Sequence, residues 1–153
     1  MRILLQRVTQ ASVTVDGKII GQIGRGYVLF VGMMEGDREE QAMWLAEKIV
    51  KLRLFEGSGD KINDKSLIDI GGGVLVVSQF TLAGNTEKGN RPDYTAAARP
   101  AIARPLYEFF IEALRNAGVA EIAMGSFGAA MEVALTNDGP VTVLLERAEK
   151  GEK

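Results

Sequence analysis

The chain has 153 residues, of which 46% are hydrophobic and 25% are charged, and its formal net charge is −2. This length and composition fit one compact globular domain rather than a disordered chain. The sequence contains no cysteine and no histidine, which excludes disulfides, thiol nucleophiles, imidazole bases and the usual His/Cys zinc sites. Any catalytic chemistry therefore has to use hydroxyls, carboxylates, lysines, backbone groups or the substrate itself.

No segment of the sequence is suited to a membrane. The longest apolar stretch, Tyr27 to Met34, is far shorter than the ~20 residues that a membrane helix needs, and the N-terminal residues resemble neither a signal peptide nor an anchor. The near-neutral net charge is also unlike the basic surface of proteins that coat nucleic acid by bulk attraction. We therefore expect a cytoplasmic protein with no membrane and no DNA partner, while specific binding of RNA by shape stays open.

The first part of the chain predicts a hairpin, a buried strand and a helix. Residues 13–20 alternate apolar and polar side chains around an Asp-Gly turn, which is typical of a β-hairpin. Residues 27–32 are apolar on both faces and too few for a helix, which favours a fully buried strand. From Asp37 to Leu54 apolar residues recur at helical spacing, with Asp37 as the N-cap and Glu40 completing a capping box. The acidic start and basic end of this helix complement its dipole, so we interpret those charges as a solvated face.

The middle of the chain predicts an exposed connection and then a central strand. Residues 55–70 are rich in Gly, Asp, Lys and Asn, whereas residues 74–82 are mostly β-branched, aliphatic or aromatic. Three polar side chains interrupt this second run, at Ser78, Gln79 and Thr81. Because a buried polar group without a partner costs ~1–3 kcal/mol, these side chains either face solvent or a helix end, or they serve a site.

A second helix and two further strands are predicted toward the C-terminus. The helix begins near Pro100 or Pro105, either of which suits a first turn, and Gly118 ends it. Residues 131–135 and 141–146 then predict two strands with a turn between them. The side chains expected to point inward from the helix are Ile102, Leu106, Phe109, Phe110, Ala113 and Leu114.

Together these elements predict a mixed α/β domain in which two main helices cover largely antiparallel strands. The sequence shows no internal repeat and no linker long enough to divide it. We expect a single domain over residues 1–147, followed by a charged and disordered tail at residues 148–153.

Two short motifs stand out, SQFTL at residues 78–82 and NDGPVT at residues 137–142. Together they resemble the signature pair of the D-aminoacyl-tRNA deacylases, the enzymes that remove D-amino acids esterified to tRNA. Without the resemblance, the Gly-Pro of the second motif would be interpreted as an ordinary turn. A peptide bond before proline is also the one that adopts the cis form at the lowest free-energy cost, ~0.5–1 kcal/mol relative to trans. Ser126 and Ala130 depart from the family pattern, which has an Arg and an Asp there. The likeness extends to residues 4–17, 44–55, 71–82 and 88–98.

The resemblance implies a homodimer of barrel-like domains with the fold of this family. It also implies that the peptide between Gly139 and Pro140 is cis and that this motif reaches into the active site of the partner subunit. There it would select chirality, because an L side chain would clash with rigid backbone while a D side chain points to solvent. Glycine has no side chain to clash, so we expect some cleavage of glycyl-tRNA, including glycine mischarged on tRNA(Ala).

The first motif carries the other residues that the resemblance assigns to the site. Ser78 and Gln79 are expected to bind the substrate, and Phe80 and Thr81 are expected to be catalytic. Phe127 is expected to line the pocket for the terminal adenosine, because bases stack on aromatic faces, although a core phenylalanine explains it nearly as well. The resemblance implies tRNA as the partner, no cofactor and no metal.

Because the chain has no histidine and no cysteine, two schemes for the hydrolysis of the ester remain. Thr81 could attack the ester as a nucleophile, but a threonine hydroxyl needs a neighbouring base and the chain has no imidazole. Alternatively, water attacks with the help of the adjacent ribose 2′-hydroxyl, while backbone N–H groups near Phe80 and Thr81 stabilise the oxyanion. We favour the second scheme, because the ester is already activated.

Two other functions stay open at this point. A sister group of deacylases removes L-alanine from mischarged tRNA, and a non-catalytic tRNA-binding module could use the same scaffold. Between residues 84 and 104 four basic side chains outnumber two acidic ones, which suggests few phosphate contacts and a gentle salt dependence. The four basic residues are Lys88, Arg91, Arg99 and Arg104.

Overall fold

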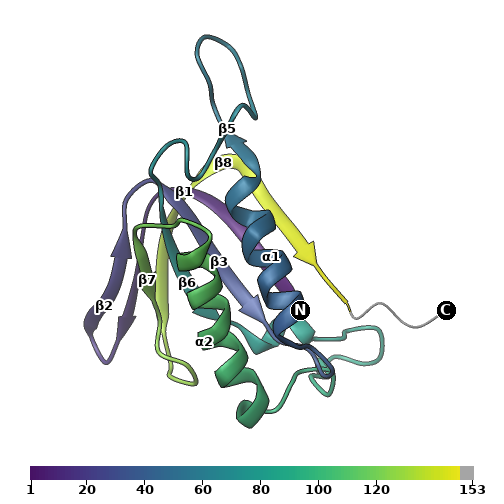
Figure 1. The fold of residues 1–153 in the computed structure, drawn as a ribbon. Helices are drawn as coiled ribbons and strands as arrows, with labels where there is room; N and C mark the ends of the chain where they lie inside the picture. Colours follow the sequence, from purple (N-terminus) through teal and green to yellow (C-terminus); the bar gives the residue numbers. More distant parts are fainter. Residues whose placement is uncertain (149–153) are drawn as a thin grey trace, which may run out of the picture.

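A computed structural model describes residues 1–148, and its main feature is a curved six-stranded sheet with two helices packed on one face (Figure 1). The sheet has the order β2-β1-β3-β6-β7, and β8 pairs with the other edge of β1. The pairings of β1 are antiparallel, whereas β3–β6 and β6–β7 are parallel. The strands are β1 Arg2–Val15, β2 Lys18–Ile23, β3 Gly26–Gly32, β6 Gly73–Ser78, β7 Ile122–Met124 and β8 Glu132–Glu146.

The sheet is nearly closed into a barrel, as predicted for the mixed, largely antiparallel domain. Strand β1 bends so that its first half pairs with β3 and its second half pairs with β2. At the far side, β2 lies against β7: a Cβ atom placed on Gly21 would be 3.0 Å from the Met124 carbonyl oxygen. The predicted hairpin at residues 13–20 and the predicted buried strand at residues 27–32 are both confirmed.

The main core lies between the sheet and the helices α1 (Glu39–Lys51) and α2 (Pro100–Asn116). Alternation along β1 places Ile3 and Leu5 on this buried face, because successive side chains of a strand point to opposite faces. A second core fills the inside of the barrel, where Val28, Leu75 and Val77 are fully buried or nearly so. Within residues 1–148 no helix is long and apolar enough to cross a membrane.

The first helix is shorter than predicted and is capped differently. It runs from Glu39 to Lys51, and Arg38 is the N-cap residue, so the predicted cap at Asp37 is wrong. Asp37 is 8% exposed and its carboxylate accepts bonds from the Met34 N–H and the N-terminal amine, so it does not belong to a solvated face. Arg38 donates its backbone N–H to the Gln41 side chain at 2.9 Å, which completes the turn that the expected box with Glu40 would have made.

The segment at residues 55–70 is not a wholly exposed connection, as the composition had suggested. Strands β4 (Arg53–Phe55) and β5 (Lys65–Ser66) form a small second sheet, which also explains why α1 ends before Leu54. Phe55 and Leu67 are fully buried in the main core and anchor this sheet. The loop between β4 and β5 projects from the top of the molecule in Figure 1.

The predicted strand at residues 74–82 is also too long. The strand β6 ends at Ser78, and residues Phe80–Ala83 form a single 3₁₀ turn, η1. The polar side chains therefore lie at the end of the strand and beyond it, where their desolvation costs less than in the centre of a sheet.

Helix α2 follows the prediction except at Ile102, which is 58% exposed rather than inward-facing. It begins at Pro100, so Pro105 lies inside its second turn. The Gly118 N–H donates to the Arg115 carbonyl and the Val119 N–H donates to the Leu114 carbonyl, while Gly118 has φ +105°. This pair of bonds and the left-handed glycine are the usual way in which a helix ends.

The C-terminal half of the sheet differs most from the prediction. Residues 132–146 form one strand, β8, that pairs along most of β1, and no turn separates two strands. The four residues 138–141 bulge out of the ladder opposite the single residue Arg7, because the pairing passes from Val8–Asn137 to Gln6–Thr142. The short strand β7 was not predicted. Of the expected tail, residues 149–153 lie outside the described residues.

Candidate active site

A cavity of about 580 Å³ lies where β6 ends against the start of α2. Ser78, Gln79 and Phe80 line it from the end of β6, and Phe127 lines it from the segment before β8. The structure therefore brings together four of the residues predicted to form the site. Thr81 lies beside this group, because its hydroxyl accepts a hydrogen bond from the Gln79 side-chain amide.

The chain leaves the sheet at Gln79. The Gln79 N–H donates to the Val31 carbonyl at 2.8 Å, and the Leu82 N–H then donates back to the Gln79 carbonyl at 3.2 Å, which closes the turn η1. A Cβ atom on Gly32 would lie 2.9 Å from the Gln79 carbonyl oxygen, so only glycine allows this close approach. The turn places Thr81, which is exposed, just beyond the C-terminal end of β6.

Aromatic rings frame the cavity on two sides. Phe80 is 60% exposed, and its ring meets the edge of the Tyr94 ring at a centroid distance of 5.4 Å. Phe127 packs against Tyr107 at 5.8 Å and carries the Arg104 guanidinium 5.5 Å from its ring centroid. The Tyr107 hydroxyl donates to the Val76 carbonyl at 3.0 Å, and burial raises the pKa of Tyr107 well above its usual value. Phe127 thus both lines the cavity and packs against the core.

The cavity has no charged lining. Among residues 1–148, the side chains that line it include no Asp, Glu, Lys or Arg, and no cluster of three acidic side chains in that range is placed to hold a metal ion. A proton acceptor of the usual strength is therefore missing at this cavity. The chemistry it can support is that of hydroxyls, amides, backbone groups and the substrate's own functional groups.

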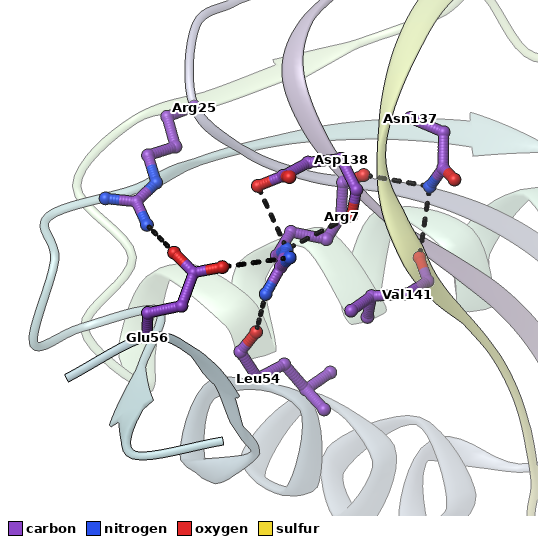
Figure 2. Close-up of polar contacts among 7 residues, drawn as sticks. All are labelled: Arg7, Arg25, Leu54, Glu56, Asn137, Asp138 and Val141. Atoms are coloured by element: carbon purple, nitrogen blue, oxygen red, sulfur yellow. Dashed lines mark hydrogen bonds and ion pairs between the residues drawn. The ribbon is translucent and has the colours of Figure 1, made fainter. Parts of the chain in front are cut away.

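The Gly139–Pro140 motif is not among the residues that line this cavity, and Figure 2 shows the contacts of its neighbours Asn137, Asp138 and Val141. Its peptide bond is cis, and both residues are exposed within the bulge of β8. The side chain of Arg7 holds this bulge, since its Nε lies 3.2 Å from the Asp138 carbonyl oxygen and 3.1 Å from Asp138 Oδ2. The Asn137 side-chain amide donates to the Arg7 carbonyl at 3.0 Å, which ties the bulge to β1, and to the Val141 carbonyl at 3.1 Å, which joins the two ends of the bulge.

The register of the sheet shows how far the motif is from the cavity of its own chain. Ser78 pairs with Val31, which pairs with Ile3, whereas the bulge lies opposite Arg7. Four residues along β1 and three strand spacings across the sheet amount to a separation on the order of 20 Å. The structure therefore does not bring Gly139 and Pro140 to the cavity within one chain.

Arg7, which holds the bulge, is a residue that the sequence did not single out. It follows Ile3 and Leu5 on the buried face of β1, and it is only 6% exposed. A charged residue in the register of a buried face is itself a signal, because buried charges have to be paired. The sequence could have drawn attention to Arg7, but it could not identify the bulge of β8 as the partner.

The predicted basic patch is exposed near the cavity. Lys88 and Arg91 lie in the loop before α2, while Arg99 and Arg104 lie at its start. Ser126 and Ala130 are also exposed, on the segment that supplies Phe127 and other lining residues.

Comparisons with known proteins identify the family of the chain. A sequence profile of the family described as D-Tyr-tRNA(Tyr) deacylase matches residues 4–146. The D-aminoacyl-tRNA deacylase of Thermomicrobium roseum is 54% identical over 149 residues, which are 97% of this chain and 96% of that protein. The D-aminoacyl-tRNA deacylase of Chloroherpeton thalassium is 49% identical over 153 residues and the full length of both chains.

Solved structures share the fold. The c-Myc DNA Unwinding Element Binding Protein superposes with a TM-score of 0.92 at 41% identity, over 97% of this chain and 100% of that one. A probable eukaryotic D-amino acid tRNA deacylase superposes with a TM-score of 0.81 at 19% identity, over 94% of this chain and 97% of that one. The chain therefore belongs to the D-Tyr-tRNA(Tyr) deacylase family, and it is a hydrolase of the ester bond in D-aminoacyl-tRNA.

Proposed function

We propose that the cavity at the end of β6 is where the ester of D-aminoacyl-tRNA is cleaved, and that the Gly139–Pro140 motif of a second copy completes it. The observation that carries this proposal is the separation of the two motifs. The SQFT residues line or adjoin an uncharged cavity, while the Gly-Pro motif is exposed at a distant bulge of the same chain. An exposed, well-anchored loop that serves no cavity of its own chain is available to the cavity of a partner.

An uncovered apolar face supports the homodimer. Leu144, Leu4 and Phe30 are neighbours across β8, β1 and β3, and Leu144 is 58% exposed. They lie on the face of the sheet opposite the helices, next to the barrel core, against which Phe30 packs. Leu4 and Phe30 are half-buried, so the three side chains form a partly exposed apolar stripe. Exposed apolar surface that is rimmed by polar residues marks interaction sites, and a second copy placed here would cover the stripe while the two bulges reach across.

The chirality check follows from the same arrangement. A backbone wedge from the partner would meet the Cα substituent of an L-amino acid and leave the D direction open, so it rejects by clash rather than by reading side chains. Each ~1.4 kcal/mol of misfit multiplies the discrimination about tenfold. Glycine has nothing to clash with, so glycyl-tRNA, including glycine mischarged on tRNA(Ala), should be cleaved to some extent.

For the hydrolysis we favour attack by water assisted by the ribose 2′-hydroxyl. The absence of a charged group from the described lining of the cavity supports this choice, because a Thr81 nucleophile would need a base that the lining does not supply. Backbone N–H groups near Phe80 and Thr81 would stabilise the oxyanion. In this scheme Ser78 and Gln79 bind the substrate, and the hydrogen bond from Gln79 orients Thr81.

Phe127 supplies the stacking surface for the terminal adenosine, because it lines the cavity with part of its ring accessible. Arg104 and the other basic side chains near α2 would meet the phosphates that follow. This reaction takes place where aminoacyl-tRNA is used, so we propose a cytoplasmic enzyme.

Deacylation assays on matched D- and L-tyrosyl-tRNA test the reaction. We expect rapid release of D-tyrosine and slow release of L-tyrosine. Faster cleavage of L-alanyl- than of D-alanyl-tRNA would instead indicate the sister activity, and tRNA binding without turnover would indicate a binding module.

A mixed dimer tests the contribution of the partner. One subunit carries Gln79→Ala and the other carries a deletion of Gly139 and Pro140, each inactive alone. If the motif acts across subunits, the mixed dimer contains one site with an intact cavity and an intact motif, and it recovers about half of the parent activity. If the motif acts within its own chain, both sites remain defective and no activity returns.

A further inference from the structure

The bulge of β8 is connected through Arg7 to a second layer of charges that the proposed function does not use (Figure 2). Glu56 follows β4, and its carboxylate oxygens lie 3.4 Å from Arg7 Nη2 and 3.6 Å from Arg25 Nη2. Arg25 lies in the turn between β2 and β3. Glu56 is thus an anion placed between two guanidinium groups, one of which holds the Asp138 carbonyl.

Three consecutive residues contact Arg7 from the small sheet. The Leu54 carbonyl accepts a bond from Arg7 Nη1, the Phe55 ring centroid lies 5.9 Å from the Arg7 guanidinium, and Glu56 pairs with it. The same Phe55 ring also faces Arg25 at 5.1 Å. The end of β4 therefore determines the orientation of the Arg7 head group, which points between this segment and the bulge.

Burial makes this orientation sensitive to each partner. The Arg7 side chain is 7% exposed, whereas the Glu56 and Arg25 side chains are about half exposed. A buried guanidinium needs its charge and its donors satisfied. Without the Glu56 charge, two guanidiniums would lie 5.9 and 5.1 Å from the centroid of one ring with no anion between them. Asp138 would then be the remaining carboxylate paired with Arg7, and the position of the Arg7 head group would be less firmly fixed.

We propose that Glu56, supported by Arg25, is a positioning residue for the discrimination between D- and L-aminoacyl esters. It touches neither the cavity nor the motif, and it acts by fixing the Arg7 side chain that holds Asp138 and hence the projection of Gly139 and Pro140. The inference rests on the proposed function, because it assumes that this motif makes the chirality check. It adds a second sheet, β4–β5, to the parts of the molecule that determine selectivity.

The effect should fall on selectivity more than on rate. Rejection of an L substrate by steric clash depends steeply on the position of the Gly139–Pro140 backbone. Cleavage of a D substrate needs only the cavity and open space in the direction of the D side chain. Loosening the bulge would therefore raise kcat/KM for L substrates relative to D substrates. A purely structural role for Glu56 would lower the stability or lower both rates together, and it would leave their ratio unchanged.

The test is the Glu56→Gln variant of the full chain, assayed on D- and L-tyrosyl-tRNA with its thermal midpoint measured alongside. We expect the L-to-D ratio of kcat/KM to rise about three- to fivefold, the range expected for losing a half-exposed ion pair. Glu56→Asp keeps the charge at a shorter reach and should give a smaller rise. The matched control is Asp64→Asn, since Asp64 pairs with Arg53 in the same small sheet and does not contact Arg7 or β8; its ratio should equal that of the parent.

Pro140→Ala separates failure of this inference from failure of the proposed function. If Pro140→Ala raises the L-to-D ratio and Glu56→Gln does not, the motif makes the chirality check and Glu56 plays no part in it. If Pro140→Ala leaves the ratio unchanged, the proposed function is wrong and the inference fails with it. Should Glu56→Gln fold poorly, Arg25→Gln removes the outer cation and should raise the ratio about twofold; an unchanged ratio there also overturns the inference.

Discussion

The hydroxyl of Thr81 accepts a hydrogen bond from the Gln79 amide, and the described residues around the neighbouring cavity offer it no base. At the scale of single residues, the proposed catalysis then depends on groups that do not change charge near neutral pH. Arg7 is a second single residue on which the proposal depends. Its buried guanidinium joins the bulge of β8 to the small sheet, and the proposed selectivity depends on the position of that bulge.

The Thr81→Ala variant distinguishes the two schemes. We expect its kcat on D-tyrosyl-tRNA to stay within about threefold of the parent, whereas loss of a true nucleophile costs several orders of magnitude. Single-turnover deacylation measures this rate, and Thr86→Ala, in the exposed loop before α2, is the control. A fall to the uncatalysed rate with binding intact would restore Thr81 as the nucleophile.

A substrate without the 2′-hydroxyl tests the other participant. D-Tyrosyl-tRNA ending in 2′-deoxyadenosine should be cleaved about 10²- to 10⁴-fold more slowly, which is the usual contribution of a positioned proton-transfer group. The spontaneous hydrolysis of the same ester must be subtracted as the control. Cleavage at full speed would contradict the proposed mechanism.

At the scale of elements, the ends of helices and strands position the site. Helix α2 begins with Pro100 at the rim of the cavity, and its other end is closed by Gly118 with φ +105°. The end of β6 at Ser78 and the turn η1 turn the SQFT motif outward. The residues of the proposed site therefore lie at short breaks in regular structure rather than within the regular segments.

Gly118→Ala tests the end of α2. An L residue at this φ costs ~1–2 kcal/mol, so we expect the free energy of unfolding to fall by about that amount and the thermal midpoint to fall by roughly 2–8 °C. Gly24→Ala is the control, because Gly24 has an ordinary φ and open space around it. Urea denaturation of both variants measures the difference, and equal stabilities would show that the cap contributes nothing.

At the scale of the whole molecule, the face opposite the helices is left incompletely covered. Leu144, Leu4 and Phe30 form an apolar stripe across three strands on this face. The stripe begins at Phe30, which packs against the barrel core, and extends outward from that core to Leu144. A second copy packed on this stripe would bury the apolar surface and would also bring each bulge toward the other cavity. Assembly and activity are therefore expected to be lost together.

Leu144→Glu tests that link. A charge at the most exposed position of the stripe should shift sedimentation from dimer to monomer and reduce deacylation at least tenfold, because desolvating an unpaired carboxylate is costly. The control is Ile62→Glu, since Ile62 is 77% exposed in the projecting loop between β4 and β5. A monomer with full activity would contradict a site shared between subunits.

The salt dependence of tRNA binding is a second property of the whole molecule. With four basic side chains near the cavity, we expect a slope of log K against log salt of about −2 to −4, since each neutralised phosphate contributes ~0.7–0.9. Filter binding between low and physiological salt measures the slope, and Lys88→Ala should reduce it by less than one. A slope as steep as −8 would indicate a much larger phosphate interface.

The local pattern of the sequence was enough for the hairpin, the strand β3 and most of α1 and α2, because alternation and helical spacing depend on near neighbours. The residues at which these elements begin and end were harder to predict from the local pattern. Asp37 has the residue type of a cap, but the N-terminal amine and the Met34 N–H bind its carboxylate instead. The residues from 74 to 82 have the propensity of a strand throughout, yet the chain turns after Ser78.

The class of fold, the absence of imidazole and thiol chemistry and the two motifs that resemble the family can all be recognised in the sequence without a structure. The three-dimensional fold is needed to show that Gly139 and Pro140 belong to a bulge within one long strand, which Arg7 holds at a distance on the order of 20 Å along the sheet from the cavity. Strand register and the pairing of a buried charge depend on residues more than 100 positions apart in the chain, and no local pattern encodes them.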